Sequence, residues 1–269
     1  FGGEELPIPE YGRVFIAIKP NTGNTLSNLA KTSIIQSLNE YRVGSLEILI
    51  TDPDLLFIEL ETIVYYDDKK TIRDNAGIIS EVQRTLDSTS VSGSIDKFGG
   101  AARFSRILGA IDSADPSIVR NTTIMKMRKD VEVVIGTPSS YEICFDQAID
   151  QNKSNFVIES SGFKLSGLTN TFFFKDDTNG NLYLYYINDL GVEIIQDSKW
   201  GTVDYVTGDL KIGYTNAVTF SATILPNNIV KVKALPLSQD IVAKKSVYLD
   251  LDVGNSSISA VIDTKAINS

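Results

Sequence analysis

The sequence contains no histidine, and this absence excludes more kinds of chemistry than any other feature of the chain. Ser-His-Asp and Cys-His catalysis need an imidazole as proton carrier, and histidine-based zinc, haem and non-haem iron sites need it as a ligand. Cys144 is the single cysteine, so the chain has no intrachain disulfide, no thiolate metal cluster and no Cys-x-x-Cys redox pair. It lies in an apolar, strand-like run, where a free cysteine is usually a small buried hydrophobic residue.

Basic residues and long apolar runs are also scarce. The 269 residues include 25 Lys and Arg against 34 Asp and Glu, which gives a formal net charge of −9. Excess acid argues against nucleic acid and anionic membranes as partners, because both reward clustered Lys and Arg. No apolar run approaches the roughly 18 residues of a membrane span, and no charged-then-apolar leader opens the chain. We therefore expect assembly in the cytoplasm, and the start at Phe1 without an initiator methionine suggests a fragment of a longer chain.

The chain does contain enough apolar sequence for one large domain or two small ones. Its composition, 42% hydrophobic and 22% charged, is typical of a globular protein. Residues 13–19 form an apolar, β-branched run that predicts a strand. Apolar residues then recur with the helical period of about 3.6 residues from Leu26 to Tyr41. This pattern predicts a helix with Asn24 or Thr25 as N-cap and Gly44 as its stop.

The next two strands are predicted to form a hairpin. They cover Leu46–Thr51 and Leu55–Tyr66, and only three residues, Asp52 to Asp54, separate them. So short a connection favours antiparallel pairing of the two strands.

Two helical stretches and a strand complete the first half. Thr71–Asp74 resembles a capping box and opens a helical face that reaches Leu86. A further helical stripe runs from Phe98 to Ile111, and Ile118–Met127 alternates as a strand. The order β-α-β-β-α-β, with its second α element doubled, is that of a split βαβ or ferredoxin-like unit. We therefore predict an α+β domain over residues 1–136, with the helices on one face of its sheet.

From about Val131 onward the helical stripes vanish and short β patterns follow. Asn179-Gly180, between two aromatic runs, is a strong hairpin signal, and Thr207-Gly208 marks a second hairpin. Further β runs lie at 221–225, 229–234, 246–253 and 257–262. Residues 137–269 are therefore predicted to form a mostly antiparallel, all-β, sandwich-like domain.

Patterns that carry chemistry are absent or have a simpler interpretation. Glu59 and Glu61 share a strand face, which is more typical of solvated charge than of a catalytic carboxylate pair. Asp176–Asn181 resembles a calcium loop, but its glycine is misplaced and a hairpin turn explains it better. No Gly-Lys-Ser/Thr phosphate loop occurs. The sequence thus predicts no catalytic residue, no cofactor, no metal and no small-molecule substrate.

The aromatic residues between Phe172 and Tyr186 are the remaining candidates. Along paired strands they are most simply the core of the β domain. A run of adjacent aromatic side chains cannot all point inward, however, because successive residues of a strand face opposite sides. The alternative hypothesis is that some of them, Phe173 and Tyr186 in particular, lie on a surface used for self-association.

Two stretches of sequence resemble a known family. Residues 1–20, FGGEELPIPEYGRVFIAIKP, are similar to the start of the C-terminal half of the baseplate wedge protein family (gene product six) of T-even-like contractile-tailed bacteriophages. Residues 201–210, GTVDYVTGDL, are similar to a hairpin pattern of phage baseplate chains. The element order as far as residue 130 also fits the broader baseplate J-like family.

The resemblance implies a structural protein of the virion tail baseplate without an active site. It implies copies that pair as homodimers and bind other wedge proteins to form the inner ring around the tail hub. An alternative from the residues is an acidic carbohydrate- or host-surface-binding module, with Trp200 and the tyrosines as stacking platform. A more distant one is a histidine-free glycoside hydrolase that uses Glu59 and Glu61.

Overall fold

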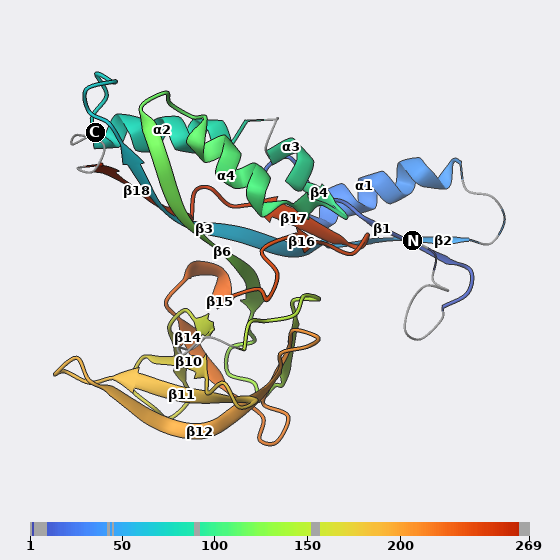
Figure 1. Ribbon diagram of the computed structural model, residues 1–269. Helices are drawn as coiled ribbons and strands as arrows, with labels where there is room; N and C mark the ends of the chain where they lie inside the picture. Colours follow the sequence, from blue (N-terminus) through green and yellow to red (C-terminus); the bar gives the residue numbers. More distant parts are fainter. Residues whose placement is uncertain are drawn as a thin grey trace.

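A long antiparallel ladder forms the centre of the molecule. The computed structural model describes residues 2, 10–41, 44, 46–88, 92–151 and 157–263, so most of the opening stretch 1–9 lies outside the described residues. Strands β3 (Asp54–Tyr66) and β6 (Ile118–Glu132) pair from Phe57 opposite Arg128 to Tyr66 opposite Ile118. On its other edge β6 pairs with β15 (Ile229–Ala234). In Figure 1, β6 therefore connects an upper α/β part to a lower β part.

Helices cover one face of the upper sheet, as Figure 1 shows. Helix α2 (Asn75–Leu86) contacts α4 (Phe104–Asp112) and strand β18 (Ser257–Ile262), while α4 contacts β6. The two helices bury the apolar side chains of Ile78, Val82, Leu86, Ile107 and Ile111. The fold is thus α+β, with few helices and one large, mostly antiparallel sheet.

The N-terminal unit differs from the prediction. Strand β1 (Arg13–Ala17) pairs in parallel with β2 (Glu47–Thr51), and helix α1 (Asn28–Asn39) connects them. The predicted hairpin of β2 with β3 is therefore wrong. A tight reversal needs residues with positive φ, and none of the residues between β2 and β3 has one. Pro53 fixes its own φ and favours an extended residue before it, so the chain continues instead of turning back.

The ferredoxin-like unit is not shown by the strand pairing. Two strands form a separate small sheet, whereas a split βαβ unit would interleave all four. The predicted stripe at 98–111 is also only partly helical. Short strands β4 (Lys97–Phe98) and β5 (Ala101–Ala102) precede α4, and helix α3 (Ser92–Ile95) precedes them.

Both predicted helix starts lie too early in the sequence. Helix α1 is capped by Ser27, whose side chain accepts the Ala30 N–H, and not by Asn24 or Thr25. Helix α2 is capped by Asp74, whose carboxylate accepts the Gly77 N–H at 2.8 Å. In each case a residue able to cap lies nearer to the first helical turn than the predicted one, and that residue takes the position.

The lower part is built from short antiparallel strands. Both predicted hairpins are confirmed. Asn179-Gly180 lies between β10 (Phe172–Asp176) and β11 (Asn181–Ile187), and Thr207-Gly208 lies between β12 (Glu193–Asp204) and β13 (Asp209–Ile212). The other strands of this part are β7 (Tyr141–Cys144), β8 (Ile158–Ser160), β9 (Phe163–Leu165) and β14 (Phe220–Thr223). The short 3-10 helix η2 (Pro226–Asn228) precedes β15.

The end of the chain returns to the upper sheet. Strand β16 (Ile241–Val242) pairs with β5, and β17 (Val247–Leu251) and β18 both run parallel to β3. Residues 247–262 therefore extend the sheet that the first half begins. The division of the chain at residue 136 stays a prediction.

Candidate interaction surfaces

Phe173 and Tyr186, the two predicted self-association residues, lie on opposite faces of the lower sheet. Strand β10 pairs with β11 so that Phe172 lies opposite Tyr186 and Phe173 lies opposite Tyr185. Directly opposed residues share a face, and successive residues alternate between faces. The structure therefore does not bring Phe173 and Tyr186 together.

Tyr186 belongs to the inner face of this sheet. Its ring meets the buried ring of Phe172 edge-on at 5.8 Å between centroids. Trp200 lies on the same core side, stacked on Phe163 at 5.6 Å and tilted against Phe174 at 5.4 Å. Since one face of the indole is occupied by a buried ring, Trp200 does not offer the open platform that sugar stacking requires.

Phe173 lies on the outer face, where aromatic and charged side chains interlock. Its ring stacks on Tyr185 at 5.6 Å, and Tyr183 lies 5.8 Å from Tyr185. The Lys175 ammonium lies 4.4 Å from the centre of the Tyr185 ring and donates to the Glu193 carboxylate at 2.8 Å. Burial, followed by the charge of Glu193, raises the pKa of Tyr183 to about 12. We call these five residues the outer aromatic face.

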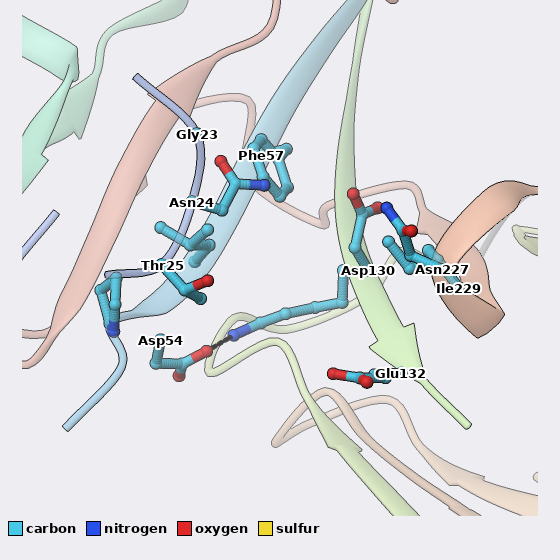
Figure 2. A pocket seen from close by; sticks show the side chains of 12 residues that line it. Gly23, Asn24, Thr25, Asp54, Phe57, Asp130, Glu132, Asn227 and Ile229 are labelled. Carbon is cyan, nitrogen blue, oxygen red and sulfur yellow. Dashed lines mark hydrogen bonds and ion pairs between the residues drawn. The ribbon is translucent and has the colours of Figure 1, made fainter. Parts of the chain in front are cut away.

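A cavity of about 660 Å³ lies where the N-terminal unit meets the two parts of the sheet. Figure 2 shows that Asp54, Asp130 and Glu132 line it together with Asn24 and Asn227. The Lys129 ammonium pairs with Asp54 across it. The charged side chains that line it are those of Asp54, Asp130, Glu132 and Lys129, so the cleft is polar and mainly acidic.

A buried ion network crosses the junction between the two parts. The Arg128 side chain is 2% exposed and pairs with Glu59, with Asp130 at 2.7 Å and with Asp252 at 2.7 Å. Glu59 also pairs with Lys233 at 2.6 Å. Both oxygens of Glu59 are thus engaged with cations, which is the arrangement of a structural charge and not of a catalytic acid.

The other predicted carboxylates are engaged in structural bonds too. Glu61 pairs with Lys126 at 2.6 Å. In the stretch that resembles a calcium loop, the buried Asp176 accepts the N–H groups of Val157 and Ile158 at 2.7 and 2.8 Å. Its second oxygen accepts the Tyr205 hydroxyl at 2.9 Å. Asp176 therefore fixes the base of the β10–β11 hairpin.

Neither metal nor thiol chemistry finds support in the part of the chain that the structure describes. No group of three or more Cys, Asp or Glu side chains among those residues is arranged to hold a metal ion. Burial, reinforced by Asp209, raises the pKa of the Cys144 thiol to about 11, so the thiol stays protonated and unreactive near neutral pH. No helix within the same described ranges is long and apolar enough to cross a membrane.

One surface was not anticipated from the sequence. At the tip of the β11–β12 hairpin, Leu190 is 86% exposed between Asn188 and Gly191. The signal that marks it is a large apolar residue placed between two turn-forming residues, where a polar one is usual.

Comparison with known proteins gives matches over the first half of the chain. Residues 1–51 match the family described as baseplate structural protein gp6, C-terminal domain I, and residues 54–130 match its C-terminal domain III. The chain is also 24% identical over 155 residues to the baseplate wedge protein gp6 of Enterobacteria phage T4. This match covers 57% of the chain but only 23% of that relative.

Proposed function

The chain carries C-terminal domains I and III of the baseplate structural protein gp6 and is a component of a phage tail baseplate, and from this premise we propose that it is a scaffold that pairs with a second copy of itself and binds neighbouring wedge proteins in the inner baseplate ring. The family is structural and not enzymatic. The observation that carries the proposal is the outer aromatic face.

The outer aromatic face has the chemistry of a contact between identical copies. Phe173 and Tyr183 are half-buried and provide rigid aromatic surface, and both rings contact Tyr185, which is buried within the single chain. Exposed aromatic surface of this kind dominates the energy of protein interfaces. Lys175 and Glu193 add opposite charges on the same face. In a two-fold contact, each pairing of one residue with another across the interface occurs twice. The proposed contact places Lys175 of one copy opposite Glu193 of the other, and the reverse, so that the charges are complementary.

The first test is the solution mass of the chain by light scattering across a dilution series. We expect a dimer at micromolar concentration, and a monomer for Phe173→Ser at the same concentration. Val206→Ser, at an 83% exposed apolar position in another turn, is the control that leaves the mass unchanged. An unchanged mass for Phe173→Ser together with a large loss of stability would assign Phe173 to the fold alone.

A charge exchange separates pairing between copies from pairing within one copy. Lys175→Glu and Glu193→Lys each place like charges inside their own chain. When the two variants are mixed, both contacts between copies regain opposite charges, while the contacts within each copy do not. We expect each variant alone to be monomeric and the mixture to form a heterodimer. A mixture that stays monomeric would contradict the proposed contact.

A further inference from the structure

The β11–β12 hairpin ends in an exposed apolar side chain beside an exposed carboxylate. Leu190 is 86% exposed, and Val192 is 51% exposed. Asp189 is exposed as well and forms no ion pair with any residue that the structure describes. We call residues 188–192 the hairpin tip. Glu193, the next residue, is paired with Lys175 on the outer aromatic face and is not part of the tip.

The turn that presents Leu190 is held by its own hydrogen bonds. The Asn188 side-chain oxygen accepts the N–H groups of Leu190 and Val192, at 3.0 and 2.9 Å. The Asn188 N–H donates to the Val192 carbonyl at 3.0 Å, and Gly191 takes a φ of +75° that closes the turn. Because the backbone is already ordered, the tip loses little conformational entropy when it binds.

A hollow of about 260 Å³ lies on the upper part of the molecule. Residues 14–17 of β1 and Phe98 of β4 give it an apolar lining, and Lys245 is the charged side chain among the described residues that line it. Lys245 is exposed and forms no ion pair within the described ranges. Since a water molecule takes up about 30 Å³ in the liquid, the hollow has room for a leucine side chain.

The hairpin tip and the hollow are complementary in shape and in charge. The tip is a convex apolar side chain next to an unpaired carboxylate, and the hollow is a concave apolar surface next to an unpaired ammonium group. Figure 1 places the β11–β12 hairpin in the lower part and β1 and β4 in the upper part, so the two do not meet within one chain. Both halves of the contact are present on this chain, and a second copy therefore provides what the tip fits.

We infer that the hairpin tip of one copy inserts Leu190 into the hollow of a second copy, with Asp189 against Lys245. Two different surfaces meet, so the contact is head-to-tail and distinct from a two-fold pairing. The inference rests on the proposed self-association and adds a second contact between copies. One apolar anchor and one ion pair bury far less than the roughly 1,200 Å² of a stable interface. The contact is therefore weaker than the dimer and acts between copies that a ring holds close together.

A diazirine analogue of leucine at position 190 tests where the tip binds. Chains labelled with light and with heavy nitrogen are mixed at high concentration, and cross-linked peptides are identified by mass spectrometry. We expect cross-links that join a light copy to a heavy copy and map to residues 14–17 or to Phe98, also after purified neighbouring wedge proteins are added. Cross-links within one copy, to Phe173 or Lys175, or to another protein, or no cross-link at all, would overturn the inference.

A charge exchange tests the ion pair of the contact. Asp189→Lys and Lys245→Glu each place like charges together and should lower the cross-link yield about threefold. The double variant has opposite charges there again and should restore the wild-type yield. Lys199→Glu, the same charge change at another exposed lysine, is the control that leaves the yield unchanged. All three side chains are exposed, so none of these variants should alter the unfolding midpoint. A double variant with no higher yield than the single ones contradicts the contact.

The solution mass separates this contact from the proposed dimer. Phe173→Ser should remove the dimer at micromolar concentration without removing the cross-link from position 190. Lys245→Glu should lower the cross-link yield and leave the dimer intact. Loss of the cross-link in Phe173→Ser would mean that the tip only follows the pairing of the outer aromatic faces, and the inference would then be wrong.

Discussion

Replacing Arg128 by alanine is expected to cost the protein a large part of its stability. Arg128 lies on β6, buried to 2% exposure, with its guanidinium 4.2 Å from the centre of the Phe57 ring. It neutralises Glu59, which is itself 3% exposed, and Asp252. In the variant Glu59 keeps only the part-exposed Lys233, and Asp252 loses its cation.

The size of the effect follows from the burial of the partners. Breaking a buried ion pair by removing one partner costs about 3–5 kcal/mol, because an uncompensated charge remains inside. The whole stability of a domain is about 5–15 kcal/mol. We therefore expect Arg128→Ala to lose about a third or more of the free energy of unfolding.

Arg120→Ala is the matched control on the same strand. Its guanidinium also lies over a ring, 3.6 Å from the centre of Tyr65, and also pairs with a carboxylate, Asp263 at 3.3 Å. The Arg120 side chain is 46% exposed, however, so water screens this pair even though the Asp263 side chain is 6% exposed, and we expect a smaller loss of stability than for Arg128→Ala. The two variants thus remove similar contacts that differ in burial.

Urea unfolding at pH 7, followed by fluorescence and circular dichroism, measures both variants. A loss for Arg128→Ala of less than about 1 kcal/mol, the upper end for an exposed pair, or a loss no larger than that for Arg120→Ala, would show that the buried charges are not what Arg128 stabilises. The slope of the unfolding free energy against urea concentration must be the same for both variants and the wild type before the difference is attributed to the native state.

The same network predicts a pH dependence. Burial raises the pKa of Asp252, but hydrogen bonds from Arg128 and Asn255 outweigh burial, so the pKa lies below its ordinary value. A carboxyl with a lowered folded pKa adds stability above its unfolded pKa of about 3.9 and loses it as the pH falls through the folded value. We expect the wild type to lose stability below about pH 4, and Arg128→Ala to lose less over the same window.

Three further changes test other parts of the structure. Burial raises the pKa of Asp96 to about 6, so stability should fall as the pH rises from about 4 to 6, and Asp96→Asn should abolish this slope in urea midpoints. Gly208→Ala places a Cβ 2.2 Å from a backbone oxygen at positive φ, and thermal unfolding should show a larger loss than for Gly191→Ala, which has open space. Tyr205→Phe removes the hydroxyl bonded to buried Asp176 and should cost about 1.5–3 kcal/mol in urea.

Sequence patterns over a few residues predicted the hairpins whose turns are determined by the residues within them. Asn179-Gly180 and Thr207-Gly208 mark real turns because their glycines take positive φ, at +97° and +78°. The β1–β2 pairing could not be predicted in the same way, since it depends on where the chain goes after Pro53. The return of β17 and β18 to β3 depends on partners almost 200 residues apart, which no local pattern encodes.

The positions of Phe173 and Tyr186 show how a shift of one residue in strand pairing decides on which face of the sheet a side chain lies. A two-residue Asn179-Gly180 turn would pair residue 178 with 181 and hence Phe173 with Tyr186, on one face. In the structure Asp176 lies opposite Leu182 and five residues, 177–181, separate them, so Phe173 meets Tyr185 instead. A slip of one residue moves every following side chain to the other face.

The buried network was hidden in the sequence for a similar reason. Arg128 stands in a run of charged residues near the end of β6, which is typical of a solvated strand end. Its burial arises only because β15 and the segment after β17 pack beside it. From the sequence alone, Glu59 is likewise expected on a polar surface, whereas in the structure Arg128 and Lys233 enclose it.

Strand β6 joins the two parts of the molecule through both of its edges, with β3 on one side and β15 on the other. Ladder hydrogen bonds lie across the strands, so a pull along β6 loads many of them together. Arg128 adds side-chain links to β3 and to Asp252 at the place where the two ladders overlap. In a baseplate component this favours movement of the two parts as one body. The β1–α1–β2 unit forms its own small sheet, and in its described residues Lys19 reaches β17, with its ammonium 3.9 Å from the Asp250 carboxylate and 5.7 Å from the centre of the Tyr248 ring. A rearrangement of the chain should therefore begin at that unit.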